Sequence, residues 1–104
     1  MAKVLIPNHK YQLANFEDGG DEQTLTFIRK ELVEGTESEL KTVENGTTNE
    51  EVLSVLIDRL QGLDEKFPDP DNKDAINHLR LALGSLNSRT AKRRRLGKEG
   101  KAIA

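Results

Sequence analysis

Two arginines near the C-terminal end of the chain are the residues best suited to binding chemistry. Arg89 and Arg93 are four residues apart, so on a helix they share one face, one turn apart. A guanidinium group pairs with phosphate oxygens through two parallel hydrogen bonds, which an ammonium group does less well. The pair therefore indicates an anion site. A second interpretation stays open: both arginines only balance the acidic half of the chain and the C-terminal dipole of their helix.

The sequence offers little for catalysis. The chain has no cysteine, which excludes disulfides, cysteine-ligated zinc and a thiol nucleophile. Its two histidines, His9 and His78, have no acidic cluster at ligand spacing. No Gly-rich phosphate loop, paired-carboxylate motif or nucleophile elbow is present. We therefore expect a protein that is not an enzyme, with no catalytic residues, no cofactor and no metal site.

Length and composition indicate one domain that needs a partner. The chain has 104 residues, 35% hydrophobic and 33% charged. We expect a β-region at 1–45, a helical hairpin at 46–97 and a flexible basic tail at 98–104. Chains of this size bury only about 60–70% of their unfolded surface, so we expect an α+β fold that is oligomeric through helix and sheet contacts. No run approaches the roughly 20 apolar residues of a membrane span, so we expect a soluble, intracellular protein.

Residue types typical of strands dominate the first 45 positions. Thr24–Lys30 is β-prone, places Leu25 and Phe27 on one face, and extends to Val33. Asp18-Gly19-Gly20-Asp21 is a strong turn signal, and Ser38–Val43 is typical of a returning strand. This pattern predicts a two- or three-stranded antiparallel sheet. A helix over 22–34 is the alternative.

Two apolar stripes predict the helical hairpin. Apolar residues recur at three- and four-residue intervals over 52–67 and again over 75–86. Pro68 and Pro70 are expected to stop the first helix, and Asp71 is a suitable N-cap for the second. Thr48 with Glu51 forms a capping-box signature at the start of the first helix, and Gly97 is a plausible stop at the end of the second. The small residues Ala75, Ala82 and Gly84 would let another helix approach closely.

Charge is spread unevenly along the chain. Residues 17–51 hold eleven acidic residues against three basic ones, whereas residues 89–101 hold seven basic residues against Glu99. The basic run permits a second function, that of a small nucleic-acid-binding or regulatory protein that uses its basic C-terminal helix. That run is short and has no interleaved aromatics, and the chain has a pI of about 5.7, so binding to nucleic acid is the less favoured expectation.

The hairpin resembles the phage anti-Thoeris sponge family, which shares a helical-hairpin domain with the phage anti-CBASS sponges. About half of the chain, 46–100, carries the resemblance, and the β-region looks like that of the same family. The matching positions include Gly46 to Leu53, Leu56 to Gln61, Lys66-Phe67-Pro68, Asn72, Ala75-Ile76, Leu79, Ala82-Leu83, Leu86-Asn87, Arg89-Thr90, Arg93, Gly97, Glu99 and Gly100.

This resemblance implies a protein that binds a ligand without catalysing a reaction. Such proteins form homo-oligomers, commonly hexamers, and sequester cyclic nucleotide immune signals in the cytoplasm of the infected bacterial host. Their ligands are cyclic ADP-ribose isomers of Thoeris or cyclic di- or trinucleotides of CBASS. By similarity, Asn72, Arg89 and Arg93 match positions that line the cyclic ADP-ribose pocket. Arginines would pair with the diphosphate, and the asparagine would hydrogen-bond to base or ribose.

The sequence departs from the family in two places. The family often has an aromatic residue, suited to stacking on adenine, where this chain has Gly62. The turn is Pro68 to Asp71, which puts acidic side chains beside the expected anion pocket.

The expected site residues lie far apart on one chain, because Asn72 and Arg89 are separated by 17 residues, about 25 Å along one helix. The resemblance therefore implies a site built by two antiparallel copies, with a dimer as the building block.

Overall fold

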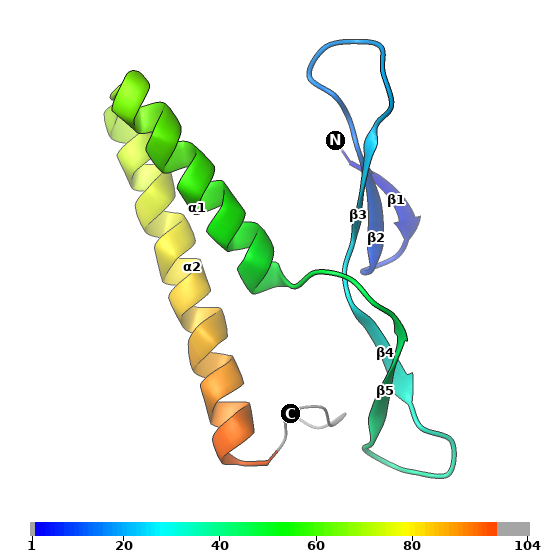
Figure 1. The fold of residues 1–104 in the computed structure, drawn as a ribbon. Coiled ribbons are helices and arrows are strands. Elements are labelled where there is room, and N and C mark those ends of the chain that lie inside the picture. The colour runs from blue at the N-terminus through cyan, green and yellow to red at the C-terminus, as the bar shows by residue number, and fades with distance from the viewer. Residues whose placement is uncertain (1, 98–104) are drawn as a thin grey trace. The chain divides into compact units, whose positions relative to one another are not determined.

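The computed structural model describes residues 2–97 and has an α+β fold. Five short strands come first, and two helices follow (Figure 1). The predicted order, an antiparallel sheet region before a helical hairpin, is confirmed. The predicted basic tail at 98–104 lies outside the described residues. The elements are β1 (Lys3–Ile6), β2 (Lys10–Leu13), β3 (Gln23–Thr26), β4 (Arg29–Leu32), β5 (Leu40–Glu44), α1 (Asn49–Lys66) and α2 (Pro70–Arg95).

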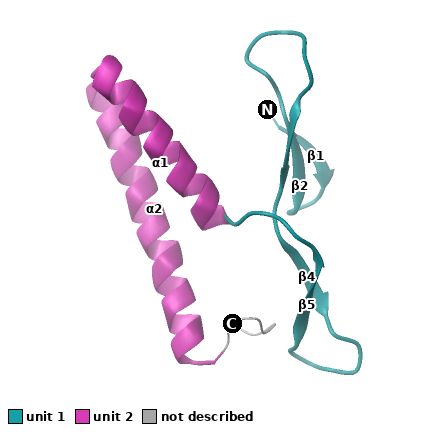
Figure 2. Ribbon diagram, in the orientation of Figure 1, with its two compact units in different colours: residues 1–48 teal, residues 49–104 magenta. Residues whose placement is uncertain are grey.

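The chain divides into two compact units at the start of α1 (Figure 2). The first unit, Met1–Thr48, holds all five strands and is called the β-unit below. The second unit, Asn49–Ala104, holds both helices. Across residues 2–97, neither helix is long and apolar enough to cross a bilayer.

The β-unit contains two small antiparallel sheets rather than the one sheet that the sequence predicts. One has the order β1-β2-β3 and the other pairs β4 with β5. The alternative of a helix over 22–34 is wrong, because β3 and β4 occupy that segment. A single strand from Thr24 to Val33 is also wrong, since the chain changes partners at its centre. Phe27 N–H donates to the His9 carbonyl (2.7 Å), whereas Ile28 N–H donates to the Thr47 carbonyl (2.9 Å).

The change of partners brings Gly46 against the backbone of the β3–β4 junction. Thr47 N–H donates to the Thr26 carbonyl (2.9 Å), and Phe27 forms a parallel bridge with Thr47. A Cβ atom added at Gly46 would lie 2.5 Å from that same Thr26 oxygen. Only glycine allows this close approach, because it has no side chain.

The helix starts match the predicted capping positions at α1 but not at α2. Because α1 begins at Asn49, Thr48 occupies the N-cap position and Glu51 the third helical position, as the capping-box signature predicts. The N-cap of α2 is Asp69 and not the predicted Asp71. The Asp69 carboxylate accepts a hydrogen bond from Asp71 N–H at 2.7 Å.

Pro70 begins α2 instead of merely stopping α1. Proline suits the first helical position, because that position needs no N–H donor and already has the φ angle that the ring imposes. At the other end, Gly97 lies beyond the helix with φ 70°, and its N–H donates to the Arg94 carbonyl at 3.1 Å. The predicted glycine stop is confirmed.

The helices pack along a heptad stripe with a small core. In the described part of the chain, the buried hydrophobic residues are Ile57 of α1, 8% exposed, and Ile76 of α2, 6% exposed. Large apolar side chains remain open to solvent on the same hairpin, including Val55, Leu56 and Leu81. The stripe itself consists of Leu53, Ile57, Leu60 and Asp64 on α1 and Asn72, Ile76, Leu79, Leu83 and Leu86 on α2.

Candidate ligand-binding site

The three predicted ligand-binding residues all lie on α2, but one chain does not bring them together. Asn72 is in the first turn of α2, and Arg89 and Arg93 are in its last two turns. The helix is continuous from Pro70 to Arg95, so about 25 Å of rise separates Asn72 from Arg89. Within one hairpin these residues form two separate half-sites.

Both arginines lie on the part of α2 that extends beyond α1. The helices have 26 and 18 residues and share the turn at one end, so the last eight residues of α2 overhang by about 12 Å (Figure 1). Arg89 is exposed, and Arg93 is half-buried. With a spacing of four residues, their side chains leave the helix only about 40° apart. The pair therefore offers a local concentration of guanidinium donors.

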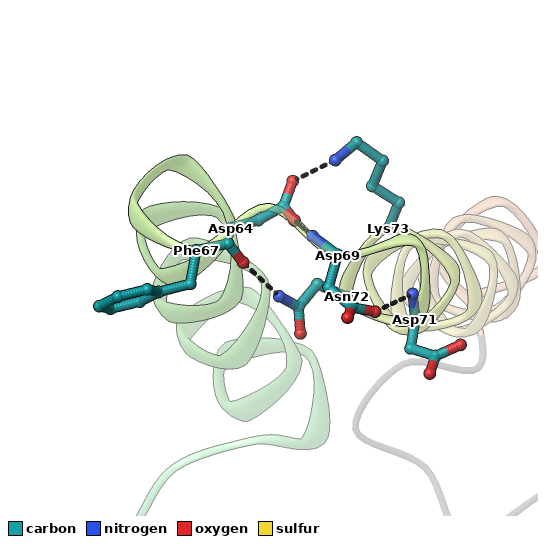
Figure 3. A network of polar contacts seen from close by, with 6 residues as sticks. All are labelled: Asp64, Phe67, Asp69, Asp71, Asn72 and Lys73. Atoms are coloured by element: carbon teal, nitrogen blue, oxygen red, sulfur yellow. Dashed lines mark hydrogen bonds and ion pairs between the residues drawn. The ribbon is translucent and has the colours of Figure 1, made fainter.

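Asn72 helps to close the helical turn. Its side-chain amide donates to the Phe67 carbonyl at 3.3 Å, and the residue is half-buried between the two helices (Figure 3). The Phe67 carbonyl is one of the orphan acceptors at the C-terminal end of α1, and Asn72 satisfies it. The bond to Phe67 uses one of the two N–H donors of the Asn72 amide, and the Asn72 side-chain oxygen remains able to accept a hydrogen bond from a ligand.

Asp64 is the centre of the turn network. Its carboxylate accepts from Lys73 Nζ at 2.9 Å and from Asp69 N–H at 3.0 Å (Figure 3). The Asp64 side chain is 16% exposed. The Lys73 hydrogen bond first, and then the Asp69 backbone donor, lower the pKa of Asp64 below its ordinary value, because both stabilise the charged carboxylate. The turn is therefore held by a carboxylate that must be ionised.

We predict that acid weakens the hairpin through Asp64. A lowered pKa means that the ionised carboxylate adds stability above the unfolded pKa of about 3.9, and that this stability is lost as the pH falls through the lower folded pKa. The melting temperature of the wild-type protein should fall more between pH 4 and pH 2 than that of Asp64→Asn, which should be less stable at pH 7. Circular dichroism melts from about pH 2 to 7 measure this difference.

The β-unit supplies the control for that experiment. The Lys10 hydrogen bond (2.8 Å) lowers the pKa of Glu44, so Glu44 contributes its own acid dependence. Glu44→Gln should flatten the profile independently of Asp64→Asn, because the two carboxylates have no shared partner. Equal losses of melting temperature in the wild-type protein and in Asp64→Asn between pH 4 and 2 would contradict the role of Asp64.

The roles of Asp64 and Asp69 were not predicted, although the sequence contains a signal for each. Asp64 is four residues after Leu60 on the inner stripe, where a carboxylate requires a polar partner. Asp69 directly precedes a proline, which is the usual order of N-cap and first helical residue. The Asp69-Pro70 signal places the N-cap of α2 two residues earlier than the predicted Asp71.

Gly62 lies in a shallow groove on α1. The groove has a volume of about 400 Å³ and is lined by Val55, Asp58, Arg59, Gly62, Leu63 and Lys66. A Cβ atom added at Gly62 meets nothing within 4 Å. The stacking aromatic expected from the family resemblance is absent, but the structure leaves room for one.

Comparison of the chain with protein-family models, with curated proteins and with solved structures finds no match.

Proposed function

We propose that this chain is a phage anti-defence protein that binds and sequesters cyclic nucleotide immune signals without hydrolysing them. Its ligands are cyclic ADP-ribose isomers of Thoeris, cyclic di- or trinucleotides of CBASS, or both, in the cytoplasm of the infected bacterial host. The observation that carries the proposal is the Arg89–Arg93 pair on the overhanging end of α2.

The chemistry of the pair suits a diphosphate. Two guanidinium groups one helical turn apart present several N–H donors to neighbouring phosphate oxygens. Four of the last residues of α2, Lys92 to Arg95, are basic, which raises the local positive potential around the pair. Sequestration needs this binding capacity and no catalytic group.

Homo-oligomerisation is part of the proposal. The core of the described hairpin is confined to Ile57 and Ile76, while Leu56 and Leu81 are 41% and 69% exposed. A second copy would cover such apolar surface and would also bring together the two half-sites that one α2 holds about 25 Å apart. We propose a dimer as the building block and a hexamer as the assembly.

Replacing either arginine with lysine should weaken binding about ten- to a hundredfold. Lysine keeps the charge but loses the bidentate hydrogen bonds, and hydrogen bonds to charged groups contribute about 1.5–3 kcal/mol each. Isothermal titration calorimetry of Arg89→Lys and Arg93→Lys, against a panel of cyclic ADP-ribose isomers and cyclic oligonucleotides, measures the loss. Arg80→Lys is the matched control, because exposed Arg80 lies on the same helix outside the pair.

Two outcomes decide the proposal. If the wild-type protein binds no member of the panel, the proposed function is wrong. If it does bind, the ligand should be recovered unmodified after the protein is denatured. A hydrolysed product would instead indicate an enzyme.

The run Lys92 to Arg95 favours a second candidate function, binding of nucleic acid by the end of α2. Four consecutive basic residues surround the helix and would contact phosphates without reading sequence. This function predicts DNA or RNA binding that weakens steeply with salt and persists in Asn72→Ala. Cyclic nucleotide binding should instead depend on Asn72.

A further inference from the structure

A reactive pair of residues lies in the short segment between β5 and α1 (Figure 1). Asn45 and Gly46 form the one Asn-Gly pair of the chain, and both residues are exposed. Gly46 N–H donates a hydrogen bond to Asn45 Oδ1 at 3.0 Å. The asparagine side chain is therefore folded back over the peptide bond that joins it to glycine.

This hydrogen bond brings a nucleophile close to an electrophile. The side-chain amide carbon of Asn45, Cγ, lies one C=O bond beyond Oδ1, so it is within roughly 4 Å of the Gly46 nitrogen. Attack of that nitrogen on Cγ closes a succinimide ring. Glycine favours the attack, because it has no Cβ atom to obstruct the approach. Reacting groups that are held this close need no catalyst to bring them together.

The Gly46 N–H is not part of a sheet. Its acceptor within residues 2–97 is the Asn45 side chain, whereas the neighbouring backbone groups are paired with one another. Thr47 N–H donates to the Thr26 carbonyl, and Ile28 N–H donates to the Thr47 carbonyl, both at 2.9 Å. The Gly46 nitrogen can therefore lose its proton and react while those hydrogen bonds stay intact. The protection of backbone amides that must open locally before they react does not apply to it.

The steps balance with water as the co-reactant. Water or hydroxide removes the Gly46 N–H proton, which ends the hydrogen bond to Oδ1, and rotation of the exposed side chain brings Cγ against the nitrogen. The nitrogen electron pair forms the N–Cγ bond, the Cγ–Nδ2 bond breaks, and the leaving group takes up a proton and departs as ammonia. Water then adds to one of the two ring carbonyls. Opening at Cγ yields aspartate, whereas opening at the backbone carbonyl yields isoaspartate, in which the main chain passes through Cβ and Cγ.

We propose that Asn45 is a site of spontaneous modification, where the folded chain converts its own asparagine to aspartate and isoaspartate without an enzyme. The inference goes beyond the proposed function, because Asn45 and Gly46 lie in the β-unit and the proposed ligand-binding residues lie on α2. Water is the reactant and ammonia is the leaving group, so the conversion depends on time and pH and on no partner.

Isoaspartate would open the junction beside it. It adds a methylene group to the main chain directly before Gly46, whose backbone already lies against the β3–β4 junction: a Cβ atom there would be 2.5 Å from Thr26 O. The longer chain shifts Gly46 and Thr47 relative to that junction and breaks the hydrogen bond from Thr47 N–H to the Thr26 carbonyl. The modification thereby limits the lifetime of the folded β-unit.

Peptide mapping of the full chain by mass spectrometry, after incubation at neutral and at mildly alkaline pH, tests the site. Position 45 should lose its amide, faster at the higher pH because the attacking nitrogen must lose a proton. Part of the product should be isoaspartate, identified by its fragmentation and by methylation with an isoaspartyl methyltransferase. Asn87 is the internal control and should keep its amide, because the N–H of Ser88 is held inside α2.

A synthetic peptide of residues 42–49 gives the reference rate for an unstructured chain. The folded chain should convert within about tenfold of the peptide's rate, because no sheet hydrogen bond has to open first. An Asn45 that stays intact while the peptide converts overturns the site, as does earlier conversion of Asn87. A product that is aspartate without isoaspartate overturns the succinimide route.

Two variants separate the added charge from the lengthened chain. Asn45→Gln has one more methylene group in its side chain, closes a ring far less readily, and should show no change of melting temperature on incubation. Fresh Asn45→Asp carries the carboxylate on a normal main chain and should melt close to the fresh wild-type protein. The isoaspartate-containing wild-type protein should melt roughly 5 °C or more lower. Equal melting temperatures before and after the modification would overturn the opening of the junction.

Discussion

Gly62→Trp should bind cyclic nucleotides about ten- to a hundredfold more tightly than the wild-type protein. Stacking of a base on an aromatic side chain contributes about 1–3 kcal/mol, and the family that the hairpin resembles often has an aromatic residue at this position. The substitution meets no steric barrier, because a Cβ atom at Gly62 has nothing within 4 Å and a groove of about 400 Å³ lies above it. Calorimetry with cyclic ADP-ribose isomers measures the gain.

Gly84→Trp is the matched control for this prediction. Gly84 is also a helical glycine with open space around its Cβ position, but it lies on α2 and does not line the groove that contains Gly62. It should add the same aromatic surface and a similar helix propensity without a gain in affinity. Equal affinities for Gly62→Trp and the wild-type protein would contradict the assignment of a stacking position to α1.

Gly46→Ala should destabilise the β-unit by about 1–3 kcal/mol, a typical cost of overpacking. The added Cβ would lie 2.5 Å from Thr26 O, 2.7 Å from Phe27 C and 2.9 Å from Ile28 N. All three are backbone atoms, so no side-chain rotation relieves the contact. The backbone would have to separate at the hydrogen bond from Thr47 N–H to the Thr26 carbonyl, which links the end of β3 to the segment that follows β5.

Denaturant unfolding followed by circular dichroism measures the effect, with Gly84→Ala as the comparison. Gly84 has open space, so alanine there should stabilise the helix by about 1 kcal/mol through its better helix propensity. The two glycine-to-alanine changes should therefore have opposite signs. An unchanged or higher stability of Gly46→Ala would show that the close approach at the β3–β4 junction does not constrain the fold.

Local signals predicted the helical hairpin well. Apolar residues at three- and four-residue spacing, the Thr48–Glu51 box and the Gly97 stop act within one or two helical turns, and each is found in place. The error at the turn was also local. Asp69, Asp71, Pro68 and Pro70 offer competing caps and stops, and the network around Asp64 favours Asp69.

The β-unit was less predictable, because its sheets depend on contacts between distant parts of the chain. The composition of residues 24–33 does not show that Phe27 N–H donates a hydrogen bond to His9 while Ile28 N–H donates one to Thr47. His9 is about 18 residues before Phe27, and Thr47 is a similar distance after Ile28. Strand propensity does not specify which distant segment a strand will pair with. The division into two sheets follows from this pairing.

The order of strands before helices, the apolar stripes and the arginine pair could all be predicted from the amino-acid sequence, because periodicity and capping are short-range. The sequence also determined that Asn72 and Arg89 are far apart on any continuous helix. The contacts between elements, in contrast, show that the Asn72 amide closes the turn on Phe67 and that Gly62 is open while Gly46 is not. These features depend on which atoms meet when two elements pack, and spacing along one element does not contain that information.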